Sequence, residues 1–267
     1  MSYLIFIVAT GLFVVFGAGG PLHRDGWLAS LDRRIDAVEL ARWPALALRV
    51  AAPLIVAAIA LWVLQLLLGG LGEAIVGTAL LYFAWGRGDY PTELQRFLAR
   101  ARVGDDVGAA MLINASDADE SLAKRALRDF AYRGFARWFP PVFYFWLLGP
   151  FAAAAYRLVA LTNSRSEGRF QDLLHLLDWL PARLVLPTYA ILGDFDRTRS
   201  LFTGDALDTQ VPADVLLAHG VEHAWRLSDT QLAAASDCAV VAVESAQKAT
   251  NRACAVWVIL ASLAALV

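Results

Sequence analysis

Long apolar runs without charged side chains constrain this sequence more than any other feature. Residues 2–20 carry no charge, and residues 44–68 carry only Arg49. A helix of about 20 apolar residues crosses the hydrocarbon core of a bilayer, and runs of this length are unusual in soluble proteins. Charged residues make up only 18% of the chain, below the roughly 25% typical of soluble domains. The sequence therefore predicts an all-α, polytopic helical membrane protein with about five to six membrane segments.

The first third of the chain predicts three spans. We expect an N-terminal membrane part over residues 1–86, in which an amphipathic connector over residues 22–43 lies at the membrane surface. Gly17–Pro21 would end the first span, because glycine and proline interrupt helices. The glycines of residues 69–72 would turn the chain between the second and third spans, so that these two spans form a hairpin.

The rest of the chain alternates between polar and apolar segments. In the first polar segment, the apolar spacing over Leu94–Ala101, followed by Gly104, predicts one helix. Pro181 and Pro187 predict that residues 173–193 form a broken or re-entrant membrane helix. The predicted segments are a cytoplasmic helical segment over 87–138, a kinked membrane core over 139–193, a polar acidic helical segment over 194–251 and a C-terminal membrane helix over 252–267.

The distribution of arginine sets the expected orientation, since cytoplasmic loops are enriched in Lys and Arg. The connector over 22–43 and the segment over 87–138 lie on the same side if three spans alternate, and both are rich in arginine. We therefore expect both of them in the cytoplasm and the N-terminus in the periplasm. The side of the 194–251 segment stays open, because it depends on whether residues 173–193 cross the membrane.

The sequence gives little support for the types of functional site that are common in soluble proteins. The net charge of −2 leaves no basic excess for nucleic acid, and no glycine-rich phosphate-binding motif occurs. Cys238 and Cys254 lie 16 residues apart, which is about 24 Å along a helix and beyond disulfide reach. The HGVEH sequence from His219 to His223 matches an inverted zinc-protease pattern. Because Gly220 weakens that helix, we favour a solvated helix and expect neither a metal nor a cofactor.

Ionisable residues inside or beside the apolar runs are the chemically interesting set. They are Arg157, Asp172, His175, Asp178 and Arg183. A charge within a bilayer is costly, so such residues pair with one another or line a functional site. Three interpretations stay open: a structural charge pair that holds a kinked helix, a pocket for a ligand or for catalysis, and exposure at the membrane interface.

One stretch of this region resembles a known family. The sequence LLDWLPARLVLPTYAILGDFD, preceded by FWLLGPFAAAAYRLV and followed by a short apolar tail, closely resembles the AmpE family. AmpE proteins are inner-membrane proteins encoded beside the amidase that recycles cell-wall muropeptides, and they are implicated in β-lactamase induction. The resemblance covers most of the chain and is most specific over Asp178–Leu184. It implies a multi-pass protein of the bacterial inner membrane that senses or modulates the envelope response to β-lactams.

AmpE is in turn similar to the CobD/CbiB family, membrane enzymes that attach aminopropanol phosphate to a corrin side chain. The motifs of that family align on Pro141–Arg157 and on Asp178–Leu184, with Arg183 retained. Its upstream acidic element, in contrast, falls on Arg128, Tyr132 and Arg133. An amide synthase needs acidic groups to hold metal and to activate a nucleophile. The resemblance therefore implies a retained scaffold that lacks the acidic site of the enzyme family, and a protein that is not an enzyme of this kind.

These residues lead to an expected function and two alternatives. We expect the arginines to suit a small anionic ligand, muropeptide-like or phosphorylated, while a basic helix face at the lipid bilayer surface explains them equally well. The alternatives are a membrane enzyme that acts on an anionic small molecule by CobD/CbiB-related amide-forming chemistry, with Asp178 and His175 as acid and base, and a structural partner of another membrane component. Catalytic residues, the ligand and homo-oligomerisation stay open. The candidate ligand-binding residues are Arg128, Arg133, Arg157, His175, Asp178 and Arg183.

Overall fold

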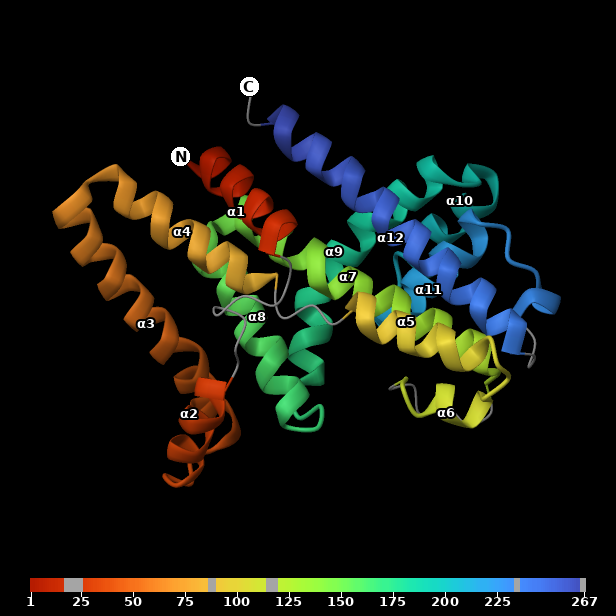
Figure 1. The fold of residues 1–267 in the computed structure, drawn as a ribbon, viewed down its shortest axis with the longest axis horizontal. Coiled ribbons are helices and arrows are strands. Elements are labelled where there is room, and N and C mark those ends of the chain that lie inside the picture. The colour runs from red at the N-terminus through yellow and green to blue at the C-terminus, as the bar shows by residue number, and fades with distance from the viewer. Residues whose placement is uncertain (17–25, 86–89, 114–119, 233–235, 265–267) are drawn as a thin grey trace. The chain divides into compact units, whose positions relative to one another are not determined.

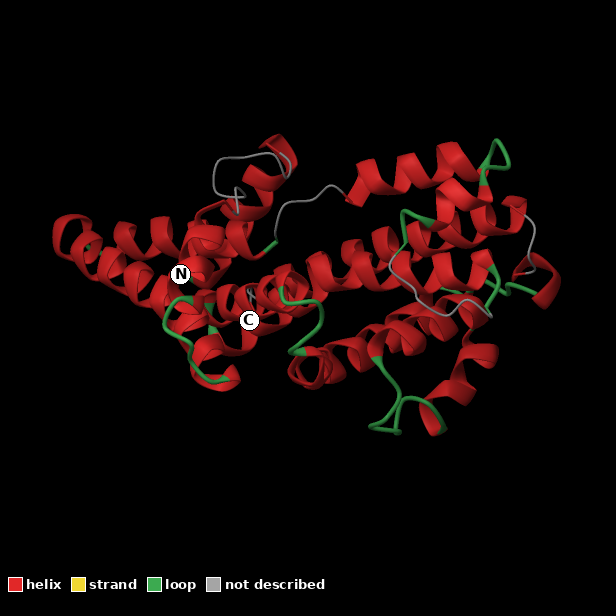
Figure 2. Cartoon of the chain, turned by 90° about the horizontal axis from the view of Figure 1, so that it is seen from below, coloured by secondary structure: helices red, strands yellow, loops and turns green. Residues whose placement is uncertain are grey.

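The chain is all-helical where it is described, as the sequence predicts. The computed structural model describes residues 1–16, 26–85, 90–113, 120–232 and 236–264, and within these ranges it contains helices and turns but no strand (Figures 1 and 2). Two predictions fall outside the described residues. These are the helix break over Gly17–Pro21 and the last three residues of the C-terminal segment.

The residues divide into two compact units. Unit 1 comprises residues 1–88 and 140–177, and unit 2 comprises residues 89–139 and 178–267. The second and third divisions fall inside two helices, α7 (Leu122–Leu148) and α9 (Gln171–Leu192). The change from polar to apolar composition at residue 139 is therefore not a helix boundary, since α7 continues through Pro140 and Pro141.

Unit 1 is built around a helical hairpin. α3 (Arg42–Leu68) ends at Gly69, whose positive φ of 59° reverses the chain into α4 (Gly70–Ala84), as the glycine turn predicts. A Cβ on Gly72 would lie 2.5 Å from the backbone of Leu64, so only glycine permits this close approach of the two helices. α4 also packs against α1 (Ser2–Phe16) and α8 (Pro150–Arg165), while α2 (Gly26–Asp36) contacts α3.

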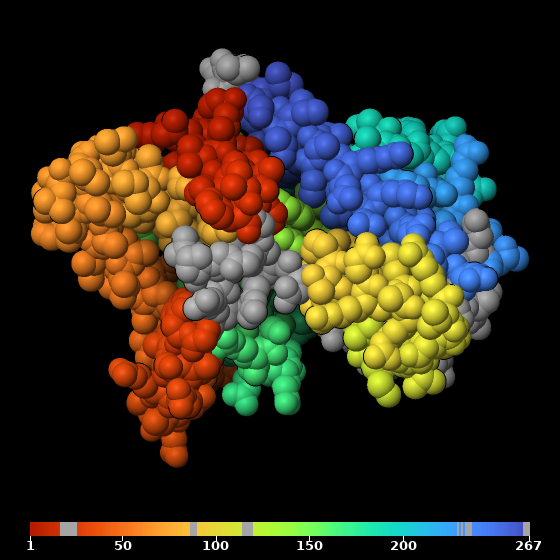
Figure 3. Space-filling view, in the orientation of Figure 1, coloured from red at the N-terminus to blue at the C-terminus, as the bar shows by residue number. Residues whose placement is uncertain are grey.

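The apolar side chains of α3 lie largely on the surface. α3 has 27 residues, and no residue of its most apolar 18-residue stretch is buried. The exposed side chains include Ile55, Ile59 and Trp62, and the hairpin surface is visible in orange in Figure 3. Among the described residues, α3 is the one helix that is both long and apolar enough to cross a membrane, because α1 and α4 are apolar but have 15 residues each.

Unit 2 is a bundle around the first part of α7 and the second part of α9. Its other elements are α5 (Tyr90–Ala101), α6 (Asp106–Ala110), α10 (Phe195–Thr203), α11 (Ala213–Ala224), the 3₁₀-helix η2 (Asp229–Leu232) and α12 (Ser236–Ala264). The predicted helix that stops before Gly104 is confirmed as α5. Fully buried alanines of α12 permit close helix packing; they are Ala239, Ala242, Ala246, Ala249 and Ala253. α12 also runs unbroken from the polar segment into the C-terminal apolar run.

The break predicted within residues 173–193 is absent from the described structure, whereas the re-entrant path stays a prediction. α9 is continuous from Gln171 to Leu192 and includes Pro181 and Pro187. Each proline removes one backbone hydrogen bond, but apolar side chains on the same stretch are fully buried in the core of unit 2, among them Val185, Leu186 and Tyr189. Tertiary packing therefore maintains the helix across both prolines.

Candidate functional site

Asp178 is the most buried of the predicted site residues. It lies on α9 with 1% of its surface exposed, and the Tyr132 hydroxyl of α7 donates a 2.6 Å hydrogen bond to its Oδ2. Burial, followed by the nearby Asp178 carboxylate, raises the pKa of Tyr132 well above its usual range. Tyr132 therefore stays a protonated hydrogen-bond donor at neutral pH. The pair can fix α7 against α9, or it can hold a proton in a position shielded from solvent.

Arg128 and Arg133 lie on the same helix as Tyr132, and each has carboxylate partners. Arg128 Nε lies 2.6 Å from Asp214 of α11. Arg133 lies 2.7 Å from Glu93 of α5 and 2.8 Å from Asp129, one turn earlier on α7. The two arginines thus connect α7 to α11 and to α5. An external anion at either arginine would have to compete with these carboxylates.

Arg183 is held by backbone carbonyls. Its guanidinium donates to the carbonyl oxygens of Ala206 at 2.8 Å and of Asp208 at 2.6 Å, in the segment that follows α10. It also donates to the carbonyl of Trp179 at 3.1 Å and lies over the Trp179 ring, 4.3 Å from its centroid. Arg183 therefore holds the 204–211 connection against α9, because the planar guanidinium of arginine can donate to several acceptors at once.

The remaining predicted residues belong to unit 1. Arg157 lies on α8 and His175 lies in the first part of α9, and both side chains are half-buried. Asp172, which the helical spacing places on the same face as His175 and Asp178, has a side chain that is 92% exposed. The structure therefore brings Asp178 together with Tyr132, but it gives Asp172 a different environment from Asp178.

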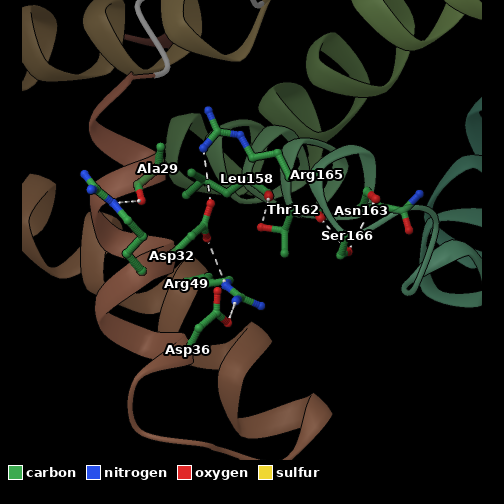
Figure 4. Close-up of polar contacts among 10 residues, drawn as sticks. Ala29, Asp32, Asp36, Arg49, Leu158, Thr162, Asn163, Arg165 and Ser166 are labelled. Carbon is green, nitrogen blue, oxygen red and sulfur yellow. Dashed lines mark hydrogen bonds and ion pairs between the residues drawn. The ribbon is translucent and has the colours of Figure 1, made fainter.

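A further charged cluster in unit 1 was missed by the sequence analysis (Figure 4). Arg49, the only charge in residues 44–68, is 8% exposed. Its Nε lies 3.0 Å from Asp32, and its guanidinium also contacts Asp36; both carboxylates come from α2. Asp32 in turn lies 3.1 Å from Arg165 at the end of α8. The four-residue spacing of the two carboxylates along α2 was the available signal, because it places both on one helix face.

The HGVEH sequence lies on α11, and its histidines have other partners. His219 Nδ1 lies 2.7 Å from Asp205, and His223 Nδ1 lies 2.9 Å from the carbonyl oxygen of Arg197. Within the described ranges, no three His, Cys, Asp or Glu side chains are grouped so that they could hold a metal ion. Cys238 and Cys254 are free thiols on α12.

The chain matches a family model over its full length. The model is described as "Regulatory signalling modulator protein AmpE", and it matches residues 1–267. Comparisons with curated proteins and with solved structures find no match. Since the family model covers the whole chain, the protein belongs to the AmpE family of regulatory signalling modulator proteins.

Proposed function

We propose that this chain is a polytopic inner-membrane protein that modulates a regulatory signal in the envelope response to β-lactams, including β-lactamase induction. The observation that carries the proposal is the match of a regulatory signalling family over residues 1–267. The proposed role is regulatory rather than catalytic. It places the protein between a change in the cell envelope and the control of β-lactamase synthesis.

The surface of α3 supports the membrane part of the proposal. A helix of 27 residues extends about 40 Å, which exceeds the roughly 30 Å hydrocarbon core of a bilayer. Contact of its exposed apolar side chains with water is unfavourable, whereas their contact with lipid is not. The one charge within residues 44–68 of this helix, Arg49, is neutralised by Asp32 and Asp36, as expected for a charge near the end of a span.

We propose the orientation that the arginines indicate. The connector over 22–43 and the segment over 87–138 would lie in the cytoplasm, and the N-terminus would lie in the periplasm. Single cysteines introduced into a Cys238→Ser, Cys254→Ser background and labelled from either side of the membrane test this topology. Periplasmic labelling at an exposed residue of α5, such as Arg96, would contradict it.

A small anionic ligand is the proposed input of the signal, with Arg128, Arg133 and Arg183 as the residues that respond. Each of these arginines already binds an internal acid or carbonyl. An anion would therefore act by exchange, releasing Asp214 or Glu93 and loosening α7 from α11 or α5. Charge reversal of Arg133 and Arg183 together tests the idea, because unchanged binding of muropeptides and phosphorylated metabolites would refute it.

The regulatory role itself is tested by deletion of the gene. We expect altered β-lactamase induction, measured beside muropeptide pools, and restoration by a plasmid copy of the wild-type gene. Complementation with a Trp62→Ala variant, which changes one exposed side chain of the proposed span, is the matched control for complementation with the wild-type gene. An unchanged induction curve in the deletion strain would remove the basis of the proposal.

A further inference from the structure

An open depression on unit 2 is lined by charged residues that do not belong to the predicted site residues. It has a volume of about 300 Å³ and lies where the end of α9, the start of α10, the end of α11 and the middle of α12 meet. Its polar lining consists of Asp194, Arg226 and Arg252, with Trp225 as the aromatic wall. All of these residues belong to unit 2.

The ends of α9 and α11 meet at the backbone of the depression. The Asp194 N–H donates a 2.9 Å hydrogen bond to the carbonyl oxygen of Ala224, which joins the end of α9 to the end of α11. A side chain at Gly193 would overlap that same carbonyl, so glycine is required for the approach. This backbone contact positions the side chains that line the depression.

Arg226 is oriented by its backbone and by Asp194. It has a positive φ of 56°, in a position directly after a helix where glycine is usual. Its Nε lies 2.7 Å from Asp194 Oδ2, while Oδ1 of the same carboxylate caps α10. The terminal guanidinium nitrogens of Arg226 make no hydrogen bond within the part of the chain that the structure describes, so they are available to a ligand. An unusual backbone conformation that is maintained in this way often marks a functional position.

Arg252 contrasts with the predicted site arginines. Its side chain is exposed and forms no hydrogen bond or ion pair with any residue that the structure describes. Arg128 and Arg133, in comparison, each contact two carboxylates. The depression therefore carries two guanidinium groups and one carboxylate, which leaves a net positive charge for an incoming anion.

The position of Arg252 along α12 indicates where such an anion comes from. It is the last charged side chain of the sequence, and the residues after it are apolar apart from Ser262. The apolar end of α9 runs beside this part of α12, because Trp257 donates a 3.1 Å hydrogen bond to Thr188. The depression thus lies at the polar end of two adjacent apolar helical stretches, where tryptophan and arginine commonly meet lipid headgroups.

We propose that this depression is a phosphate-binding site, in which the guanidinium groups of Arg226 and Arg252 bind the phosphate oxygens and Trp225 contacts the carbon atoms attached to that phosphate. Arginine forms paired, charge-assisted hydrogen bonds with phosphate. The phosphate belongs either to a phospholipid headgroup or to a soluble compound. Only the lipid source rests on the proposed membrane location, and the site does not require the regulatory role.

The test uses the full-length protein purified in a neutral detergent. One arm measures retention of added phosphatidylglycerol by native mass spectrometry, with diacylglycerol as the phosphate-free control. The other arm measures binding of inorganic phosphate by calorimetry. Arg252→Ala and Arg252→Lys are compared with Arg199→Ala, which removes an exposed arginine of α10 that does not line the depression. Because neither Arg252 nor Arg199 has a partner in the described structure, unchanged thermal unfolding verifies that the variants fold.

We expect Arg252→Ala to weaken phosphate binding roughly tenfold or more, since it removes hydrogen bonds to a charged group, and Arg252→Lys to weaken it less. Loss confined to phosphatidylglycerol identifies a lipid headgroup site. Loss of inorganic phosphate binding, with lipid retention unaffected, identifies a site for a soluble phosphate compound. If Arg252→Ala and Arg199→Ala behave alike with both probes, or if the wild-type protein binds neither probe, the proposal is refuted.

Discussion

Replacing Tyr132 with phenylalanine isolates the contact between α7 and the buried Asp178. The substitution removes one hydroxyl and little volume. It deletes a 2.6 Å hydrogen bond to a carboxylate that is 1% exposed, so water cannot take the place of the lost donor. A hydrogen bond to a charged group contributes about 1.5–3 kcal/mol. We therefore expect the free energy of unfolding to fall by about 2 kcal/mol.

The measurement is reversible unfolding of the detergent-solubilised protein, followed by helical circular dichroism. Tyr3→Phe is the matched control, because within the described residues the Tyr3 hydroxyl forms no hydrogen bond, and we expect no change for it. A double-mutant cycle with Asp178→Asn should give a coupling energy of at least about 1 kcal/mol. A Tyr132→Phe variant within about 0.5 kcal/mol of wild type would refute the assignment of this contact as a stabilising one.

Three further perturbations follow from the same structure. Asp32→Asn removes one of two carboxylates from the buried Arg49, so unfolding should become easier by about 1–2 kcal/mol; the exposed Glu39→Gln should have no effect in the same unfolding assay. Gly134→Ala would place a Cβ 2.6 Å from Thr250 Oγ1 and should destabilise unit 2 by about 1–3 kcal/mol, with partial rescue by Thr250→Ala; no rescue would contradict the close approach of α7 and α12. The backbone N–H of Arg197 and, to a smaller extent, the Arg226 side chain lower the pKa of Asp194. The stability that the ionised Asp194 adds is therefore present above its unfolded-state pKa of about 4. It is lost as the pH falls through the lower folded-state pKa. Asp194→Asn should abolish that part of the acid-side slope in a pH series of thermal unfolding, and an unaltered slope would contradict it.

Local sequence signals predicted individual helices well. The spacing over Leu94–Ala101 and the glycine turn at residue 69 both correspond to observed helix ends. These signals succeed because they depend on a few neighbouring residues and on backbone conformation. They failed at Pro181 and Pro187, where burial of neighbouring apolar side chains offsets two lost backbone hydrogen bonds.

The candidate site was predictable only in part. The presence of Asp178 in an apolar run indicated a charge that needs a partner, and the structure shows it buried with the Tyr132 hydroxyl as a hydrogen-bond donor. The partner, Tyr132, lies 46 residues earlier; the family resemblance placed it beside Arg128 and Arg133, but nothing in the sequence paired it with Asp178. Arg252 was not recognised at all, because an arginine before an apolar run looks like an ordinary interfacial charge.

The sequence by itself determined the helical class, the apolar surface of α3 and membership of the AmpE family. Each of these properties is encoded in runs of neighbouring residues, which act on the backbone and on solvent in the same way wherever the helix lies. Only the tertiary structure decided which charges meet: Arg49 is neutralised by α2, Arg128 and Arg133 contact internal acids, and Arg252 pairs with none of the residues that the structure describes. The physical reason is that a charge pair between helices depends on which helix faces pack together. The periodicity of a helix specifies which of its own residues share a face, but it does not specify the face of the neighbouring helix.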